Sequence, residues 1–290
     1  MASTRELRRH IRSIRATRQV TKAMEMVSSS KMRRAITSTL ATRPYAERAL
    51  AVIADLNAAS GEVTHPLLTS RPVKKVTLVT ISSDRGLAGA YDSSITRAAA
   101  QFIQERQAEK QHVTLITLGR KSETALSHLG FTAEQSYPHS LSHPDPADTT
   151  PISSMLTGRF LNGETDEVYV VWTSFKSALK QETELRKLLP LRNDLPAVTP
   201  THQTQFLYEP SPEVVLNYIL PRLVDAQFYQ FLQESLASEH AARRLAMNNA
   251  SENASSIIDD LQLTYNGVRQ SSITQEIAEI TGGAAALEER

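Results

Sequence analysis

The residues best spaced for chemistry lie in the segment SDRGLAGAYD at 83–92. It follows a run of apolar residues and precedes an Ala-rich segment, which indicates a turn between a strand and a helix. Phosphates often bind at such turns in α/β folds. However, Gly86 and Gly89 do not form a GxGxxG pattern, and no GKS or GKT of a P-loop follows. A tight turn capped by Ser83 or Asp84 therefore explains the segment better than a nucleotide site.

Other kinds of catalytic or metal site have even less support. The chain has no cysteine, which excludes disulfides, thiolate metal ligands and a cysteine nucleophile. The histidines are scattered, and the pair in HSLSHPD at 139–145 lies in a proline-rich segment that only weakly suggests zinc. No Ser–His–Asp pattern stands out. We therefore expect no catalytic residue, no metal site and no bound cofactor.

Positive charge is concentrated at the start of the chain. Residues 1–34 contain ten Lys or Arg and two acidic residues, whereas the net charge of the whole chain is only +1. On a helix, five of the arginines fall within an arc of about 120°, opposite a row of apolar residues. We call these five the basic stripe: Arg5, Arg8, Arg9, Arg12 and Arg15. A solvated face or an acidic protein partner explains the stripe better than DNA, because no aromatic or dimeric recognition element accompanies it.

The stripe requires a long helix, and both ends of the chain have the composition of long helices, with few glycines and prolines. Between Ser3 and Ser60 there is no glycine and one proline, Pro44, at which the helix could bend. Residues 222–281 contain no proline and one glycine, Gly267. Sixty helical residues would extend about 90 Å, so each helix needs a partner.

Apolar residues spaced four and three apart indicate that the partner is a coiled-coil helix. The C-terminal helix shows this spacing at Ile273, Ile277, Ile280, Ala284 and Leu287. The first helix repeats it at Ala49, Ile53 and Leu56. Polar residues such as Lys31 and Asn248 interrupt the pattern, so we expect a partial or irregular pairing. A helical bundle is the alternative, but the rest of the chain offers few further helices.

The middle of the chain has the pattern of a small α/β domain. Continuous apolar runs at 76–81, 113–118 and 168–172 are typical of buried parallel strands. Segments 93–107 and 121–129 have helical composition and spacing between them. Four prolines then predict a long irregular connection: Pro138, Pro144, Pro146 and Pro151.

The sequence therefore predicts a mixed α/β fold in three parts. Residues 1–60 form one long helix, 72–205 a Rossmann-like domain, and 211–290 a second long helix that pairs with the first as an antiparallel coiled coil.

Several motifs resemble the gamma subunit of bacterial-type ATP synthases. They are IRATRQVTKAMEMVSSSKMRRA at 14–35, SDRGLAG at 83–89, LASEHAARRLAM at 236–247 and RQSSITQEIAEITGGAAAL at 269–287. The motifs occur in the family's order, and the resemblance spans nearly the whole chain. It implies a non-catalytic rotor shaft that turns inside a hexamer of alpha and beta subunits. It also implies contacts with an epsilon subunit and a membrane ring of c subunits, at the cytoplasmic face of a bacterial plasma membrane, without membrane insertion or nucleic acid.

The resemblance further implies a cluster of residues that couples the shaft to the surrounding subunits. It comprises Lys22, Met24, Arg243, Gln270, Thr274 and Glu276. Two rival classes remain: a nucleotide-dependent α/β enzyme, and a coiled-coil scaffold or basic-helix nucleic-acid binder.

Overall fold

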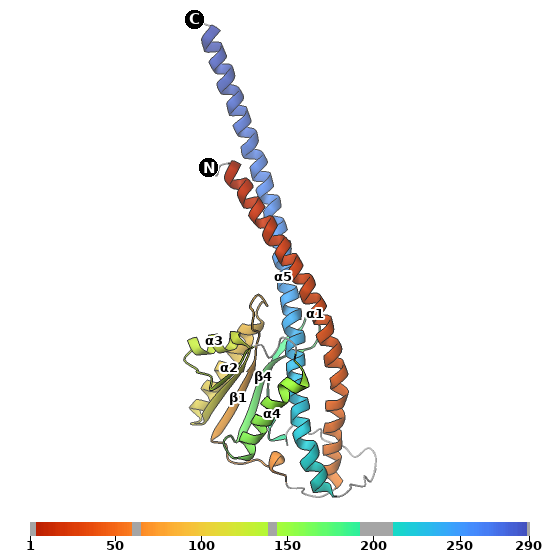
Figure 1. Cartoon of the computed structure of the whole chain (residues 1–290). Helices are drawn as coiled ribbons and strands as arrows, with labels where there is room; N and C mark the ends of the chain where they lie inside the picture. The colour runs from red at the N-terminus through yellow and green to blue at the C-terminus, as the bar shows by residue number, and fades with distance from the viewer. Residues whose placement is uncertain (1–3, 60–64, 139–143, 192–210, 289–290) are drawn as a thin grey trace. The chain divides into compact units, whose positions relative to one another are not determined.

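The structure, a computed structural model, is dominated by a long helix at each end of the chain (Figure 1). Helix α1 is Thr4–Ala59 and helix α5 is Pro212–Glu288. Proline suits the first position of α5, because the first N–H groups of a helix have no partner within it. The structure describes four segments of the chain: residues 4–59, 65–138, 144–191 and 211–288.

The chain divides into two compact units, which we describe separately. The larger unit, Ser28–Arg243, is called the body. The smaller unit consists of Met1–Val27 and Arg244–Arg290 and is called the terminal pair. Helices α1 and α5 each contribute residues to both units.

A five-stranded sheet forms the centre of the body, in the order β3-β2-β1-β4-β5. The first four strands in this order run parallel to their neighbours, and β5 runs antiparallel to β4. The three apolar runs form β1, β2 and β4, as the sequence predicted. The strands are β1 Lys75–Ile81, β2 His112–Leu118, β3 Gln135–Tyr137, β4 Glu167–Phe175 and β5 Gln181–Leu189.

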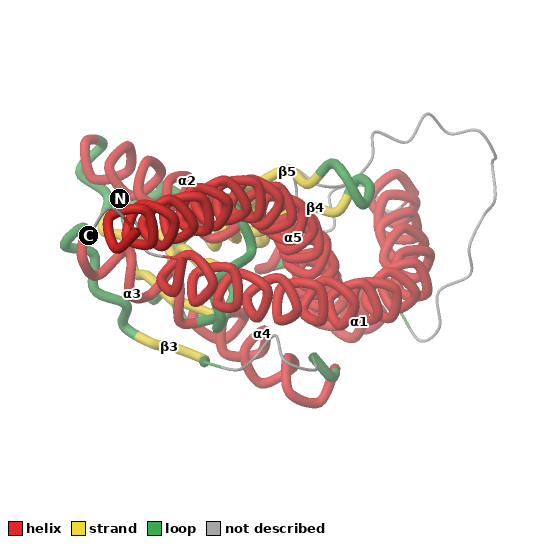
Figure 2. The backbone as a smooth tube through the Cα atoms, turned by 90° about the horizontal axis from the view of Figure 1, so that it is seen from above, coloured by secondary structure: helices red, strands yellow, loops and turns green. Residues whose placement is uncertain are grey.

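Helices cover both faces of this sheet (Figures 1 and 2). The two predicted helices are present as α2, Tyr91–Ala108, and α3, Arg120–His128. A third, α4, is Pro146–Leu161, and a short 3-10 helix, η1, is Pro66–Leu68. None of the helices within the described residues is both long and apolar enough to cross a membrane.

The alternation of side chains along the strands produces two cores. On β1, Val76 and Leu78 pack under α2 and α3, whereas Val79 and Ile81 face α4 and α5. Successive side chains of a strand point to opposite faces of the sheet, so a continuous apolar run suits a sheet covered on both sides. The core under α5 anchors that helix to the sheet.

The predicted irregular connection between Pro138 and Pro151 is wrong for its second half. Pro146 begins α4, and Pro151 lies inside it. The side chain of Asp145 accepts a hydrogen bond of 2.9 Å from the backbone N–H of Ala147 and so caps the helix. Proline at the first helical position loses an N–H that has no partner there, which is why this segment can form a helix.

In the terminal pair, α1 and α5 run antiparallel. Arg8 of α1 lies beside Tyr265 of α5, whereas Lys22 shares a cleft with Ser251. Rising numbers on one helix therefore meet falling numbers on the other. Only a few apolar side chains are buried in this unit, which agrees with the expected irregular pairing: Leu7, Ile11, Met247, Ala254 and Ile258.

The predicted seam near the end of α5 is not buried in this chain. Ile273, Ile277 and Ile280 are 45%, 56% and 72% exposed. Helix α1 begins only one turn before the residue that meets Tyr265, so it has no residues left to cover them. The periodicity correctly indicated an apolar face on α5, but α1 does not cover that face. The side chains of the equivalent positions in α1 lie outside the described residues: Ala49, Ile53 and Leu56.

Candidate functional site

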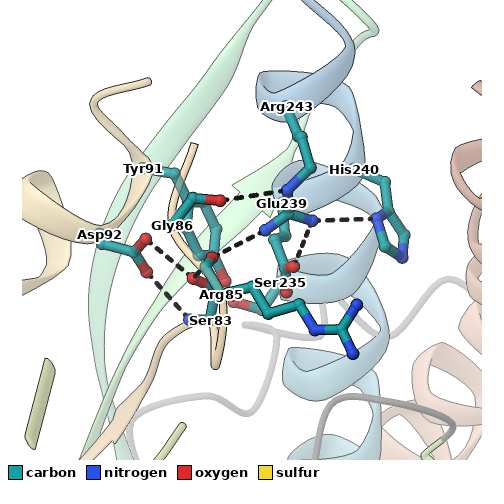
Figure 3. A network of polar contacts seen from close by, with 9 residues as sticks. All are labelled: Ser83, Arg85, Gly86, Tyr91, Asp92, Ser235, Glu239, His240 and Arg243. Carbon is teal, nitrogen blue, oxygen red and sulfur yellow. Dashed lines mark hydrogen bonds and ion pairs between the residues drawn. The ribbon is translucent and has the colours of Figure 1, made fainter. Parts of the chain in front are cut away.

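The loop between β1 and α2 is closed by a carboxylate of its own helix (Figure 3). Asp92 accepts hydrogen bonds from the backbone N–H of Ser83 at 2.9 Å and from its hydroxyl at 2.8 Å. The expected cap by Ser83 or Asp84 is wrong. Helix α2 begins after Ala90, which has no side-chain cap, and Asp84 instead accepts from the backbone N–H of Arg120 at the start of α3, at 3.3 Å.

This arrangement disfavours a phosphate in the loop. The N–H of Ser83 is already paired, and the Asp92 carboxylate lies where an anion would have to bind. Within the described residues, no group of three or more His, Asp or Glu side chains is placed to hold a metal ion. His139 and His143 lie outside those residues. The geometry is that of a structural turn.

Arg243 of α5 joins that turn to the long helix (Figure 3). It pairs with Glu239 at 2.6 Å and donates to the backbone carbonyls of Arg85 at 2.9 Å and Gly86 at 3.4 Å. Its Nη1 is also 3.5 Å from Nδ1 of His240, and since a guanidinium only donates, that ring nitrogen is the acceptor. Arg243 is only 8% exposed, so these contacts replace its hydration.

The groups around Arg243 are electrostatically coupled. Burial raises the pKa of Glu239 above its usual value of 4.5, although Arg243 acts in the opposite direction. Burial also raises the pKa of the Tyr91 phenol well above 10.0, and the charge of Glu239 adds to this. The neutral phenol shares a 2.7 Å hydrogen bond with Ser235 of α5. The body therefore attaches α5 to the sheet through a buried polar network as well as an apolar core.

The basic stripe lies on the terminal pair. All five of its arginines are exposed, whereas Leu7 and Ile11 on the other side of α1 are buried. Arg8 donates to the hydroxyl of Tyr265 at 2.6 Å, and its guanidinium carbon lies 5.6 Å from the centre of that ring. The stripe thus presents a cationic surface, as its spacing indicated.

A cleft of about 530 Å³ extends this cationic surface along the terminal pair. Basic side chains of α1 line one wall, and small or polar side chains of α5 line the other. The lining residues are Arg15, Arg18, Gln19 and Lys22 from α1, with Asn248, Ser251, Glu252 and Ser255 from α5. Three basic residues against one acidic residue give the cleft a positive potential that suits carboxylates.

Five of the six expected coupling residues lie in the terminal pair, at different levels along its helices, and the sixth lies in the body. Lys22 pairs with Glu25 at 2.9 Å beside the cleft, whereas Met24 is half-buried and does not line the cleft. Arg243 belongs to the buried network of the body. The other three are exposed on α5: Gln270, Thr274 and Glu276. Glu252 of α5 lines the cleft, and Gln270 lies about 27 Å farther along the same helix.

Sequence reasoning did not identify the partners of Arg243. Glu239 precedes Arg243 by four residues, which is the spacing of a helical ion pair and could have been noticed. The bonds to the carbonyls of Arg85 and Gly86 had no such signal, because every residue carries a carbonyl and the loop is distant in sequence.

The chain is similar to ATP synthase proteins along its whole length. Residues 3–287 match the family described as ATP synthase. The chain is 43% identical to the ATP synthase gamma chain of Herpetosiphon aurantiacus, covering 99% of both, and 44% identical to that of Roseiflexus sp., covering 100% of both. A chain in the central stalk and c-ring of Tetrahymena thermophila mitochondrial ATP synthase has a TM-score of 0.63 at 25% identity and covers 80% of this chain and 99% of its own. One in the Euglena gracilis mitochondrial ATP synthase has a TM-score of 0.67 at 18% identity, over 98% and 94%.

Proposed function

Because the chain belongs to the ATP synthase gamma chain family, we propose that it is the central rotor shaft of a proton- or sodium-translocating ATP synthase. In this role it couples rotation of a membrane ring to conformational changes at catalytic sites on other subunits. The observation that carries the proposal is the terminal pair, whose cationic and apolar side chains are exposed on two antiparallel helices.

A shaft must transmit torque, and the body supplies a firm attachment for this. Trp172 of β4 stacks on Phe231 of α5 with 4.0 Å between ring centroids, and its indole N–H donates to Glu234 at 3.1 Å. Ser153 of α4 donates to Asp225 of α5 at 2.5 Å. Together with the Arg243 network, these contacts attach α5 to the sheet, to α4 and to the β1–α2 loop at several points along the helix. A close-packed joint of this kind transmits strain instead of absorbing it.

The partners follow from the same proposal. The terminal pair turns inside a hexamer of alpha and beta subunits, and the body contacts an epsilon subunit and a ring of c subunits. The chain is peripheral, at the cytoplasmic face of the plasma membrane, and has no membrane insertion of its own. Catalysis belongs to other subunits, and the chain needs no cofactor and binds no nucleic acid. The Asp92 carboxylate in the β1–α2 loop supports this division, since it disfavours phosphate.

Co-purification tests the proposal directly. A tagged full-length chain, expressed in its own cells, should bring down alpha, beta and epsilon subunits in fixed proportion. Recovery of nucleic acid or of unrelated helical proteins, with no ATP synthase subunits, would favour the rival scaffold or nucleic-acid binder. None of the relatives described above supports that rival.

Met24 tests the proposed role of the shaft in coupling. In Met24→Lys, a new ion pair with a carboxylate on a beta subunit, worth about 1–2 kcal/mol, would slow escape from one rotary state roughly five- to thirtyfold. We expect assembly and ATP hydrolysis to persist while ion pumping falls. Met26→Lys is the matched control, because Met26 is a neighbouring methionine that is already 60% exposed.

Both activities are measured side by side in reconstituted vesicles. If hydrolysis and pumping fell in proportion, or if Met26→Lys had the same effect, Met24 would have no specific role in coupling. A second change at Arg243, Gln270 or Thr274 that partly restored pumping would show that these positions act in coupling together with Met24.

A further inference from the structure

The short helix η1 is capped by a histidine. Nδ1 of the His65 ring accepts a hydrogen bond of 3.1 Å from the backbone N–H of Leu67, which is the first donor of η1 because Pro66 has no N–H. Serine, threonine, aspartate and asparagine are the usual capping residues, and none of them changes charge near neutral pH. Histidine does, so the cap of η1 is titratable.

The other nitrogen of this ring connects η1 to the long helix α5. Nε2 of His65 lies 3.1 Å from Oδ1 of Asn217, in the second turn of α5. Since a neutral imidazole carries one proton and Nδ1 is an acceptor, Nε2 donates this hydrogen bond. The ring is buried, whereas Asn217 is exposed, so protons from solvent can reach this edge of the ring.

The segment that His65 holds contributes to the core of the body. Leu67 and Leu68 are both buried, and they belong to the same apolar cluster as Leu216 and Leu220 of α5. The backbone carbonyl of His65 also accepts from the N–H of Leu68 at 2.9 Å. The cap and the core contacts thus lie on the same few residues, and loss of the cap affects the packing at the start of α5.

Protonation of the ring is incompatible with this arrangement. An imidazolium has an N–H at both nitrogens, so Nδ1 would direct a donor at the N–H of Leu67. Burial lowers the pKa of His65 below its usual value of 6.5, and the hydrogen bond with Asn217 acts in the opposite direction. The stability that the neutral ring contributes is therefore complete above pH 6.5 and is lost as pH falls through the folded pKa.

Neighbouring charges do not compensate a proton on His65. Within the described residues, no charged side chain hydrogen-bonds to the ring or is among the causes of its lowered pKa. The charged residues on the surrounding elements are Glu213, Arg222 and Asp225 of α5, Asp148 and Arg159 of α4, and Arg71 after η1. Glu213 lies one turn before Asn217 but is exposed, so an ion pair with it would contribute little.

We propose that His65 is an acid-released latch, which fixes η1 to the start of α5 when its ring is neutral and releases η1 when the ring is protonated. The latch is complete within one chain, so it operates whether or not the chain is assembled into a complex. In a rotor shaft its opening would loosen the first turns of α5, while the stacking of Trp172 on Phe231 farther along the helix remains.

NMR titration of His65 tests the protonation step. The full-length chain is labelled in the rings of its eight histidines, and the signal of His65 is identified by its absence in His65→Asn or His65→Gln. We expect a pKa below 6.5 and, at pH 7.5, a proton on Nε2. A pKa of 6.5 or higher, or a proton on Nδ1 at pH 7.5, would overturn the proposal.

Hydrogen exchange tests the release of η1. Protection of the Leu67 and Leu68 amides, corrected for the intrinsic effect of pH on exchange, is compared at pH 7.5 and at one unit below the measured pKa of His65. It should fall by up to about tenfold, because opening is linked to the uptake of one proton. Strands β1 and β4 should keep their protection over the same range. Unchanged protection of both leucine amides would contradict the release.

Three variants separate the latch from a general effect of acid. Asparagine caps helices without titrating, so His65→Asn should keep Leu67 protected at pH 7.5 and lose most of the pH dependence. His65→Ala should lower this protection at both pH values. The matched control is His128→Asn, which should behave as the wild type because His128 is exposed at the end of α3. Full pH dependence in His65→Asn, or wild-type protection in His65→Ala, would overturn the proposal.

Discussion

The body and the terminal pair are built from the same two helices but use them in different ways. In the body, α5 is covered by the sheet and α4, and Phe228, Leu232 and Ala237 are each 0% exposed. In the terminal pair, the same helix leaves Leu263 73% exposed. One part of α5 is thus stabilised by its own chain, whereas the other has surface available for partners.

The difference shows that helical periodicity identifies an apolar face and does not say what covers it. Interior positions of the body are filled at the density of an organic crystal, so changes there should cost stability. Exposed positions of the terminal pair should tolerate the same changes in the free chain, and any cost should appear only in the complex.

The largest effect is expected from Phe228, at the centre of the α5 core. Phe228→Ala should destabilise the body by about 3–5 kcal/mol, through lost burial and the cavity left behind. Ile277→Ala on the same helix is the control, and because Ile277 is exposed it should change stability by less than about 0.5 kcal/mol. Scanning calorimetry of the full-length chain measures both. Equal losses would mean that the two parts of α5 do not differ in the way described.

Arg243 should have the next largest effect. Arg243→Met leaves the Glu239 carboxylate buried without its countercharge, which should cost about 3 kcal/mol at pH 8. Because the pKa of Glu239 is already raised above 4.5, its penalty is full above the folded pKa and is lost as pH falls toward 4.5. The deficit of the variant should therefore shrink on acidification.

A second variant gives the Arg243 prediction its control. Combining Arg243→Met with Glu239→Gln removes the buried charge and should recover part of the stability at pH 8. Urea unfolding at several pH values measures both effects. A deficit that was constant from pH 8 to pH 5, without recovery in the double variant, would show that packing and not charge makes Arg243 necessary.

Two ion pairs, one in the body and one in the terminal pair, should contribute less to stability than Phe228 or Arg243. In the body, Asp166 accepts from the backbone N–H groups of Lys74 and Lys75, each at 2.9 Å, and pairs with Arg71 at 2.8 Å. Partial burial alone would raise the pKa of Asp166, but these hydrogen bonds and Arg71 lower it below 3.8. Asp166→Asn should thus cost about 1–3 kcal/mol at pH 7.

The sign of the pH dependence follows from the lowered pKa. The stability that Asp166 contributes is present above pH 3.8 and is lost as pH falls from there through the folded pKa, so the variant should approach the wild type only below pH 3.8. Glu25→Gln in the terminal pair is the control, because its partner Lys22 is 55% exposed and such pairs contribute about 1 kcal/mol or less. A larger cost for Glu25→Gln than for Asp166→Asn would reverse the comparison.

The smallest effect on the free chain is expected from the basic stripe. Replacing Arg8, Arg9 and Arg12 together by glutamine should change stability by less than about 1 kcal/mol, since only Arg8 has a described partner outside its own helix. Assembly with partner subunits should weaken, more at low than at high ionic strength, because salt screens the wild-type attraction. Arg97→Gln, on an exposed face of α2, is the control. Assembly that was equal to the wild type at every salt concentration would assign the stripe to solvent.

The elements with a strong local signal were predictable from sequence. Strands β1, β2 and β4 are continuous β-branched runs because both faces of the sheet are covered, and such runs have few other uses. Strand β5 was not predicted. Its sequence, QETELRKLL, is largely polar, since it lies at the edge of the sheet and is buried mainly at its end.

The functional residues were predictable only in part. Five arginines on one helix face showed a cationic surface, because that property depends on spacing within a single element. The attachment of Arg243 was not visible, because its acceptors are carbonyls contributed by a loop more than 150 residues away.

The stacking of Trp172 on Phe231 has a practical consequence for watching the molecule at work. Trp172 is the only tryptophan of the chain, so its fluorescence reports a single place, the contact between β4 and α5. Its indole N–H donates to Glu234, and Arg186 lies 5.4 Å from its ring, so any slip of α5 would change the field that sets the emission wavelength. The fluorescence of Trp172 therefore reports displacement of α5 against β4 while torque acts on the chain, without an attached dye.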